Sequence, residues 1–270
     1  MKNTVKFQGN DIYFFEVINN KIIINDNYQG VLILNNEFEI IKNIYLMEDL
    51  IIDVCFKKES RILLICYEKE CIIYLDIEND IKEIMFMEGI NNYNFFMLYE
   101  WNNYNIILST YENDFLNLDI KEEKLEFLNS NSREVYRIKR EYSKLRELKI
   151  YKIFIEIKRA VIEEYDIIKL IKYKEDIKYI SSIEKENFHD FECFNDCLIG
   201  ISENKVSVLS CGNKKDYYPK KGYYFLRGKV INIEKESYLV LLSSSKNDIT
   251  DTMIERYILR SNECYHSKMQ

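Results

Sequence analysis

The sequence predicts an all-β fold assembled from six copies of one repeat unit. Each unit has a short apolar strand, a polar turn, a second strand, an acidic turn and a third strand. Two units keep the same register throughout, because Leu63 lies 43 positions before Ile106 and Leu75 lies 43 positions before Leu118. Repeats of about 20 to 50 residues are typical of stacked or radially arranged supersecondary units. The repeat therefore predicts architecture and carries no information about chemistry.

Length and composition favour one repeat-built domain over residues 1–270. The chain has 270 residues, of which 47% are hydrophobic, so it can bury a large core and does not have the composition of a disordered chain. Its 22 tyrosines accompany a high content of Ile, Lys and Asn. All four residue types have codons rich in A and T, so the tyrosine content is given no functional weight.

The first three units cover residues 11–44, 50–86 and 95–129. The first reads DIYFFEV, KIIIN, VLIL and EFEIIKNI. The second reads LIIDVCF, ILLICY, CIIYLDI and IKEIMF, and the third reads FFMLYEW, NIILSTY, DFLNLDI and KLEFL. Short runs rich in Ile, Leu, Phe and Tyr between polar turns predict antiparallel strands. The second and third strands are almost continuously apolar, which predicts burial on both faces.

The period changes after the third unit and predicts one inserted helix at 132–148. Asn131 followed by Glu134 resembles a capping box at its start. Apolar residues then follow spacings of three and four, the pattern of a helix face. These residues are Val135, Ile138, Tyr142, Leu145 and Leu148.

The last three units cover residues 150–180, 188–218 and 229–260. The turns of the fourth are poorly marked, so part of it could equally be helical. The fifth reads FHDFECF, CLIGIS, KVSVLSC and KDYY, and the sixth reads KVINIE, SYLVLLSS and TMIERYILR. Leu239 lies 41 positions after Leu198, which keeps the period.

At this level of a degenerate repeat the chain resembles the β-propeller superfamily, in which four-stranded blades surround a central channel. The resemblance covers roughly residues 5–260 and implies a six-bladed β-propeller-like fold. The sequence lacks the Trp-Asp and Gly-His pairs of WD repeats and the paired glycines of kelch repeats, so no specific family is indicated. Asparagine at many turns substitutes for glycine, because it tolerates left-handed backbone geometry. The alternatives are a β-sandwich or two all-β domains separated at the helix.

Charge and the lack of targeting signals bear on partner and location. The formal net charge of −7 argues against a general nucleic-acid binder, which usually has a basic face. The first residues have no signal-peptide pattern, and no apolar window reaches the length of a membrane span. We therefore expect a cytoplasmic protein with no membrane span.

The cysteines agree with a reducing compartment. Seven cysteines, an odd number with scattered spacing, do not suggest a disulfide framework. Several lie inside apolar runs, where a thiol acts as a small hydrophobic group. Four are expected to be largely buried: Cys55, Cys66, Cys71 and Cys197.

Motifs for metals, nucleophiles and cofactors are weak. His189, Cys193 and Cys197 form H-x3-C-x3-C, but an extended strand holds these side chains too far apart to converge on a metal. Cys211 beside Gly212 would need a histidine base, and the chain has 2 histidines. The glycine patterns of phosphate-binding loops do not occur. No metal site and no cofactor are expected.

Carboxylates at strand openings leave one enzymatic alternative. Propeller glycosidases use paired carboxylates beside the central channel. Four acidic residues fall in or beside the opening strands of their units: Asp53, Glu100, Glu192 and Glu234. The alternative function is a carboxylate-based, glycosidase-like hydrolase. Solvated strand ends explain the same residues, and a single tryptophan is few for a sugar cleft.

The inserted helix carries the best candidate for a partner-binding surface. Between residues 133 and 149, seven basic residues oppose three acidic ones in a chain that is acidic overall. Such a helix suits an acidic protein, RNA or an anionic membrane surface, although a solvated helix face has the same pattern. The residues assigned to the surface are Arg133, Arg137, Arg140, Lys144 and Arg146.

These observations favour a non-enzymatic protein-binding propeller in the cytoplasm. A repeat scaffold without a credible catalytic constellation is typical of binding proteins. Within this class, an acidic surface and the lack of a cofactor motif suggest an inhibitor or immunity-type protein that neutralises one protein partner.

Overall fold

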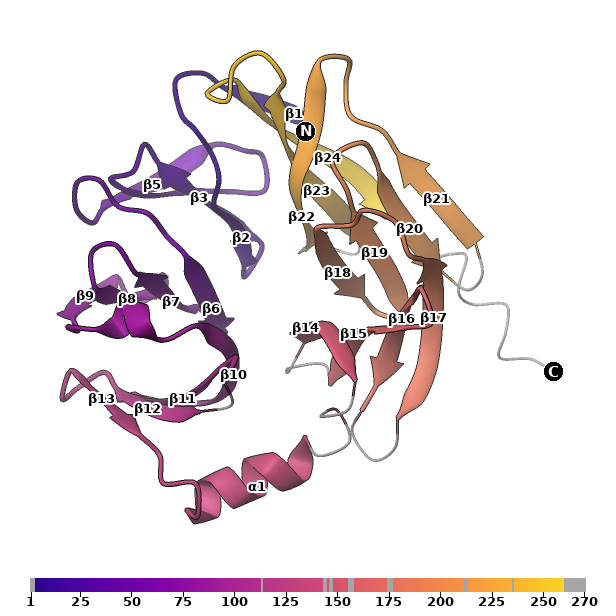
Figure 1. The fold of residues 1–270 in the computed structure, drawn as a ribbon. Helices are drawn as coiled ribbons and strands as arrows, with labels where there is room; N and C mark the ends of the chain where they lie inside the picture. The colour runs from indigo at the N-terminus through magenta and orange to yellow at the C-terminus, as the bar shows by residue number, and fades with distance from the viewer. Residues whose placement is uncertain are drawn as a thin grey trace. The chain divides into compact units, whose positions relative to one another are not determined.

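The fold consists of six four-stranded antiparallel sheets and one α-helix (Figure 1). The structure is a computed structural model that describes residues 3–112, 114–142, 145, 148–154, 158–173, 177–210, 213–234 and 236–259. Six sheets of four strands confirm the predicted all-β fold. The chain divides into two compact bodies, a smaller body of residues 47–146 and a larger body of residues 1–46 and 147–270.

The smaller body contains two sheets and both short helices. The first sheet is β6 (Val54–Lys58), β7 (Arg61–Cys66), β8 (Cys71–Asp76) and β9 (Ile81–Phe86). A 3-10 turn, η1 (Ile90–Asn92), leads to the second sheet. That sheet is β10 (Phe95–Asn102), β11 (Asn105–Thr110), β12 (Phe115–Asp119) and β13 (Lys124–Phe127), and α1 (Arg133–Glu141) follows it.

The larger body contains four sheets. One sheet is β2 (Phe15–Ile18), β3 (Lys21–Asp26), β4 (Gly30–Leu34) and β5 (Ile40–Tyr45). The next is β14 (Lys149–Phe154), β15 (Arg159–Glu164), β16 (Ile167–Lys172) and β17 (Lys178–Glu184). The third is β18 (Asp190–Phe194), β19 (Cys197–Ile201), β20 (Val206–Ser210) and β21 (Asn213–Tyr217). The described part of 150–180 is thus built of strands and has no helix.

The last sheet combines both ends of the chain. It contains β22 (Tyr223–Ile233), β23 (Glu236–Ser245), β24 (Thr252–Leu259) and, beside β24, the N-terminal strand β1 (Thr4–Phe7). Thr4 lies opposite Glu255 and Phe7 lies opposite Thr252. The N-terminal residues therefore complete a sheet whose other three strands lie more than 200 positions later in the sequence.

Apolar middle strands supply the core, as their composition predicts. In the smaller body, one cluster joins its two sheets through residues such as Leu63, Ile72, Trp101 and Leu118, all buried. Full burial of one such aliphatic side chain contributes about 1.5–3 kcal/mol. The core therefore accounts for the near-continuous apolar runs of β7, β8 and β11.

Asparagine forms turns in the left-handed backbone region, as predicted. Asn19, Asn20, Asn103 and Asn195 have φ angles of 46°, 60°, 47° and 52°. An L-residue other than glycine usually avoids this region, and asparagine is among those that tolerate it best. The low glycine content is therefore compatible with tight hairpins.

The helix is shorter than the 17 residues that its apolar spacing predicts. The N-cap is Ser132, one residue after the suggested Asn131. The Ser132 Oγ accepts a hydrogen bond from the Val135 amide at 3.2 Å, and the helix begins at Arg133. It ends at Glu141, although Tyr142 and Leu145 beyond it are also buried. The apolar spacing therefore reflects burial that continues beyond the last helical residue. No described helix is long and apolar enough to cross a membrane.

The cysteines of the described chain are free thiols, as expected. Cys66 and Cys71 are buried, whereas Cys55, Cys193 and Cys197 are half-buried. The prediction of a largely buried thiol is therefore confirmed for Cys66 and Cys71 and is wrong for Cys55 and Cys197. Cys211 and Cys264 lie outside the described residues.

Candidate partner-binding site

Helix α1 packs on one face of the β10–β13 sheet. Val135 and Ile138 are buried on its inner side. The ring of Tyr142, just beyond the helix, meets that of Tyr99 edge-on at a centroid distance of 4.8 Å. The Nζ atom of Lys139 lies 5.7 Å from the centre of the Phe115 ring. The apolar residues of the helix thus pack against the sheet, and its basic residues lie at the edge of this contact.

A pocket of about 770 Å³ lies between α1 and this sheet. Its lining comes entirely from the smaller body. The lining residues are Glu100, Asn102, Asn105, Ile107, Asn117, Arg133, Glu134, Tyr136, Arg137 and Arg140.

The wall formed by the sheet is a ladder of polar side chains around one apolar residue. Glu100 on β10, Ile107 on β11 and Asn117 on β12 lie side by side in register. Asn102 and Asn105 form the next pair. The Nδ2 group of Asn117 donates a hydrogen bond to Oδ1 of Asn105 at 3.3 Å. Because alternate residues of a strand face the same side, these side chains share one surface of the sheet.

The wall formed by the helix carries three of the five basic residues assigned from the sequence. Arg133, Arg137 and Arg140 all line the pocket. They oppose two carboxylates of the lining, those of Glu100 and Glu134, so guanidinium groups are in excess. The structure therefore brings these three arginines together at one hollow. Lys144 and Arg146 lie outside the described residues.

Glu100 already forms an ion pair with one of these arginines, Arg137. Its carboxylate pairs with the Arg137 guanidinium and also accepts a hydrogen bond from Nδ2 of Asn102. The Arg137 side chain remains 58% exposed and that of Glu100 25%. The pair is therefore open to solvent and can be exchanged for another carboxylate at modest cost.

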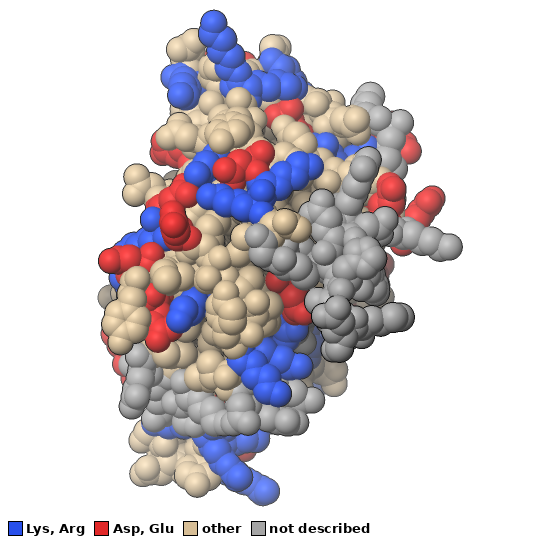
Figure 2. Space-filling model, turned by 90° about the vertical axis from the view of Figure 1, so that its right-hand side faces the viewer, with Lys and Arg blue, Asp and Glu red and all other residues tan. Residues whose placement is uncertain are grey.

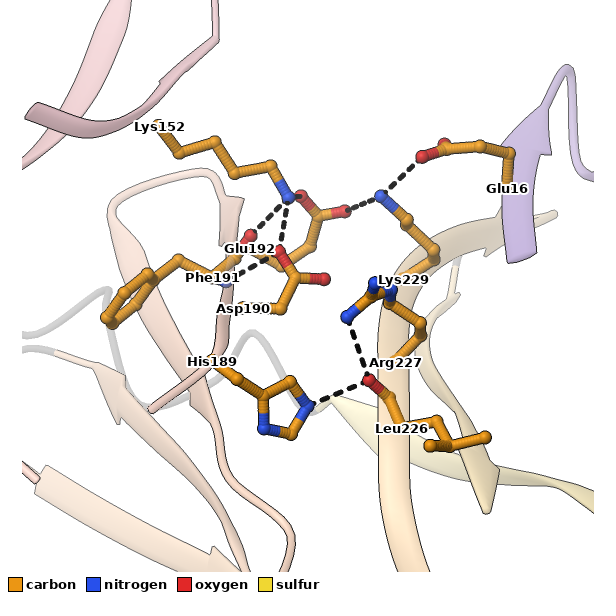
Figure 3. Close-up of polar contacts among 9 residues, drawn as sticks. All are labelled: Glu16, Lys152, His189, Asp190, Phe191, Glu192, Leu226, Arg227 and Lys229. Atoms are coloured by element: carbon orange, nitrogen blue, oxygen red, sulfur yellow. Dashed lines mark hydrogen bonds and ion pairs between the residues drawn. The ribbon is translucent and has the colours of Figure 1, made fainter. Parts of the chain in front are cut away.

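A second charged cluster lies on β2, β14, β18 and β22, one strand from each of the four sheets of the larger body (Figure 3). The Nζ atom of Lys229 on β22 lies 2.7 Å from Glu16 on β2 and 3.8 Å from Glu192 on β18. The Nζ atom of Lys152 on β14 lies 2.9 Å from Asp190 and 3.4 Å from Glu192. These five residues, called the inner-strand network below, link the four sheets.

The inner-strand network is internally paired and largely buried, with Lys152 its most exposed side chain at 27%. The Lys229 side chain is 7% exposed, and those of its three acidic neighbours are 12–16% exposed. Burial by itself would lower the pKa of Lys229, but Glu16, Glu192 and Asp190 raise it above its ordinary value. Burial would likewise raise the pKa of Asp190, but Lys152 and Lys229 lower it. The shifts favour the charged forms, which suits ion pairing and does not suit a general acid.

The four carboxylates proposed for a hydrolase have separate local roles. Asp53 accepts a hydrogen bond from the Tyr67 amide at 2.7 Å. Glu100 belongs to the pocket beside α1, and Glu192 belongs to the inner-strand network. Glu234 lies in the turn between β22 and β23 with a φ angle of 55°. Asp53, Glu100 and Glu192 therefore each have a hydrogen-bond or ion-pair partner.

The histidine and cysteine motif spans a hairpin and not one extended strand, because His189 precedes β18, Cys193 lies on β18 and Cys197 begins β19. Nε2 of His189 lies 2.8 Å from the Leu226 carbonyl oxygen (Figure 3). The Cys193 thiol donates to the Asn195 carbonyl at 3.5 Å. No group of three or more metal-ligating side chains forms among the residues that the structure describes. His266, the other histidine weighed as a base, lies outside them.

Other charged surfaces mix the two signs. On the face shown in Figure 2, basic and acidic side chains lie next to one another. Ion pairs of the larger body follow the same pattern, for example Lys185 with Glu163 at 2.8 Å and Lys205 with Glu186 at 2.7 Å. The helix side of the pocket differs, because three arginines gather there.

Comparisons with solved structures establish the fold. The β-propeller domain of Cps50 (Swd1) from Myceliophteria thermophila matches with a TM-score of 0.61 at 9% identity, over 95% of this chain and 100% of that one. Hsv2 from Kluyveromyces lactis matches with a TM-score of 0.55 at 10% identity, over 92% and 98% of the two chains. Together with the six sheets, these matches confirm a six-bladed β-propeller. No protein-family model and no curated protein matches the chain.

The pocket contains three of the arginines predicted for partner binding, whereas its opposite wall was not predicted. In the sequence, Asn102 lies between two predicted strands, and Asn105 and Asn117 lie within predicted strands. The available signal was the alternation of the strands, which places Asn105, Ile107 and Asn117 on one face. The strand alternation does not predict that α1 packs against this face of the sheet.

Proposed function

We propose that this protein is a non-enzymatic binding protein that docks a protein partner against α1 and the adjoining sheet. The observation that carries the proposal is the pocket in which Arg133, Arg137 and Arg140 meet the polar ladder of β10–β12. Arginine is favoured at interfaces, because its planar guanidinium forms paired hydrogen bonds with carboxylates. A repeat scaffold also provides an extended, rigid surface around such an anchor.

The finer role that we propose is that of a cytoplasmic inhibitor or immunity-type protein that neutralises this partner. The acidic chain supports it, because a net charge of −7 repels other acidic proteins and leaves the helix as a local exception. The paired inner-strand network also supports it, because its carboxylates are held as ion-pair partners.

The test is capture of partners from native lysate with the full chain and with a charge-reversed variant. In the variant Arg133→Glu, Arg137→Glu and Arg140→Glu are combined. The partner should be retained by the wild type, and its affinity for the variant should fall at least about tenfold, with a weaker dependence on salt. Titration calorimetry with the purified partner measures both quantities.

A matched control separates the site from total charge. Lys121→Glu, Lys178→Glu and Lys215→Glu change three exposed lysines outside the pocket by the same total charge. The control should bind as the wild type does. If the purified partner binds all three proteins equally, the binding face lies elsewhere and the proposal fails.

A further inference from the structure

We infer that the element recognised in the α1 pocket is an extended acidic peptide segment of the partner, and that Glu100 acts as an internal competitor for it. The inference rests on the proposed function, which it makes specific. It assigns a ligand chemistry to the pocket and a regulatory role to one residue of its lining.

The first step is the state of Arg137. Glu100 binds this guanidinium in the same manner that a carboxylate of a ligand would, and Asn102 holds the carboxylate from the other side. The Arg137–Glu100 pair thus shows how the pocket can bind the carboxylate of a ligand. Because the Arg137 side chain is 58% exposed, an incoming carboxylate can reach it.

The second step is the distribution of donors. Arg133 also lines the hollow, and the described residues offer its side chain no ion pair. A ligand with several carboxylates can engage Arg133 and Arg137 together. A ligand with one carboxylate can engage only one of the two arginines, which favours a segment with repeated acidic residues.

The third step is the amide ladder. Asn105 and Asn117 each carry an amide with more hydrogen-bonding capacity than the one bond that joins them uses. Side-chain amides pair with both the N–H and the C=O of a peptide backbone. Ile107, buried at the sheet wall opposite Asn117, supplies an apolar surface for the stem of a glutamate. These features suit a peptide better than an inorganic anion.

The test is fluorescence anisotropy of a labelled oligoglutamate peptide titrated with the full chain at low salt. Arg137→Gln should weaken binding about tenfold, because a charge-assisted bond is lost. Glu100→Gln should strengthen it about two- to fivefold, because an exposed competing ion pair is removed. Lys121→Gln and Glu122→Gln, neighbours in the exposed turn after β12, repeat the two charge changes outside the pocket and should have no effect.

Several outcomes would overturn the inference. Equal gains from Glu100→Gln and Glu122→Gln would show that net charge alone matters. Competition by inorganic phosphate at the concentration effective for the peptide would indicate an anion site without peptide recognition. Absence of peptide binding, or binding unaffected by Arg137→Gln, would exclude this ligand class.

The peptide experiment and the partner experiment can fail independently. A partner that needs the three arginines but is not displaced by oligoglutamate would refute the acidic segment and leave the proposed function standing. Peptide binding with the expected variant pattern, but no protein captured through the helix, would refute the proposed function and support the ligand chemistry.

Discussion

The inner-strand network and the α1 pocket use the same chemical groups in opposite ways. In the network, Lys229 is almost fully buried and lies within 4 Å of two carboxylates. In the pocket, Arg137 is mostly exposed and has Glu100 as a neighbour that it shares with solvent. A buried charge must be paired, because its desolvation costs several kcal/mol, whereas an exposed charge remains available to a partner. We therefore assign the network a structural role and propose the pocket as the recognition surface.

The largest expected effect that tests this contrast is loss of Lys229. Lys229→Met removes a buried cation that lies 2.7 Å from Glu16 and 3.8 Å from Glu192, so we expect a loss of about 3–5 kcal/mol in the free energy of unfolding. Urea denaturation followed by circular dichroism measures it. Lys214→Met, which removes a more exposed pair with Glu186, should cost no more than about 1 kcal/mol. Equal losses would mean that the network does not hold the larger body together.

Acid sensitivity sharpens the same contrast. The pKa of Asp190 lies below its ordinary value of 3.8, because Lys152 and Lys229 outweigh the effect of burial. A depressed pKa contributes stability above the ordinary value, and this contribution is lost as the pH falls through the folded-state pKa. Unfolding free energies measured below about pH 5 should thus fall more steeply for the wild type than for Asp190→Asn. Parallel pH profiles for the two proteins would contradict the ion-pair role of Asp190.

A smaller effect is expected at the start of the helix. Ser132→Ala removes the side-chain cap of α1 and should cost about 1 kcal/mol, because the Val135 amide loses its acceptor. Asn131→Ala, one residue earlier, should change stability less. Urea midpoints of the two variants compare them directly. A larger loss from Asn131→Ala would restore the capping position suggested by the sequence.

Local patterns in the sequence were sufficient to predict the six sheets and the existence of the helix. Apolar runs such as ILLIC are buried on both faces, and short polar turns separate them from the neighbouring runs. The end of the helix was not predictable in this way. Tyr142 and Leu145 continue the apolar spacing and are buried, but they lie beyond Glu141, where the helix ends.

The two charged clusters show why a site is harder to predict than a fold. Glu16 and Lys229 lie 213 positions apart, and their pairing follows from the order of the sheets, which no local pattern encodes. The basic helix was visible because its arginines are close in sequence. The asparagines on the opposite side of the pocket could not be predicted in this way. The register of the sheet is needed to place Asn105 and Asn117 on the face that lines the pocket.

The most direct test of the contrast is one experiment with two readouts on two variants. Unfolding free energy and affinity for the oligoglutamate peptide would be measured for Lys229→Met and Arg137→Gln, at a temperature where both are folded. We expect Lys229→Met to lose stability and keep its affinity, and Arg137→Gln to lose affinity with a stability change within about 0.5 kcal/mol. If stability and affinity fall together in both variants, the division between a structural network and a recognition pocket is wrong.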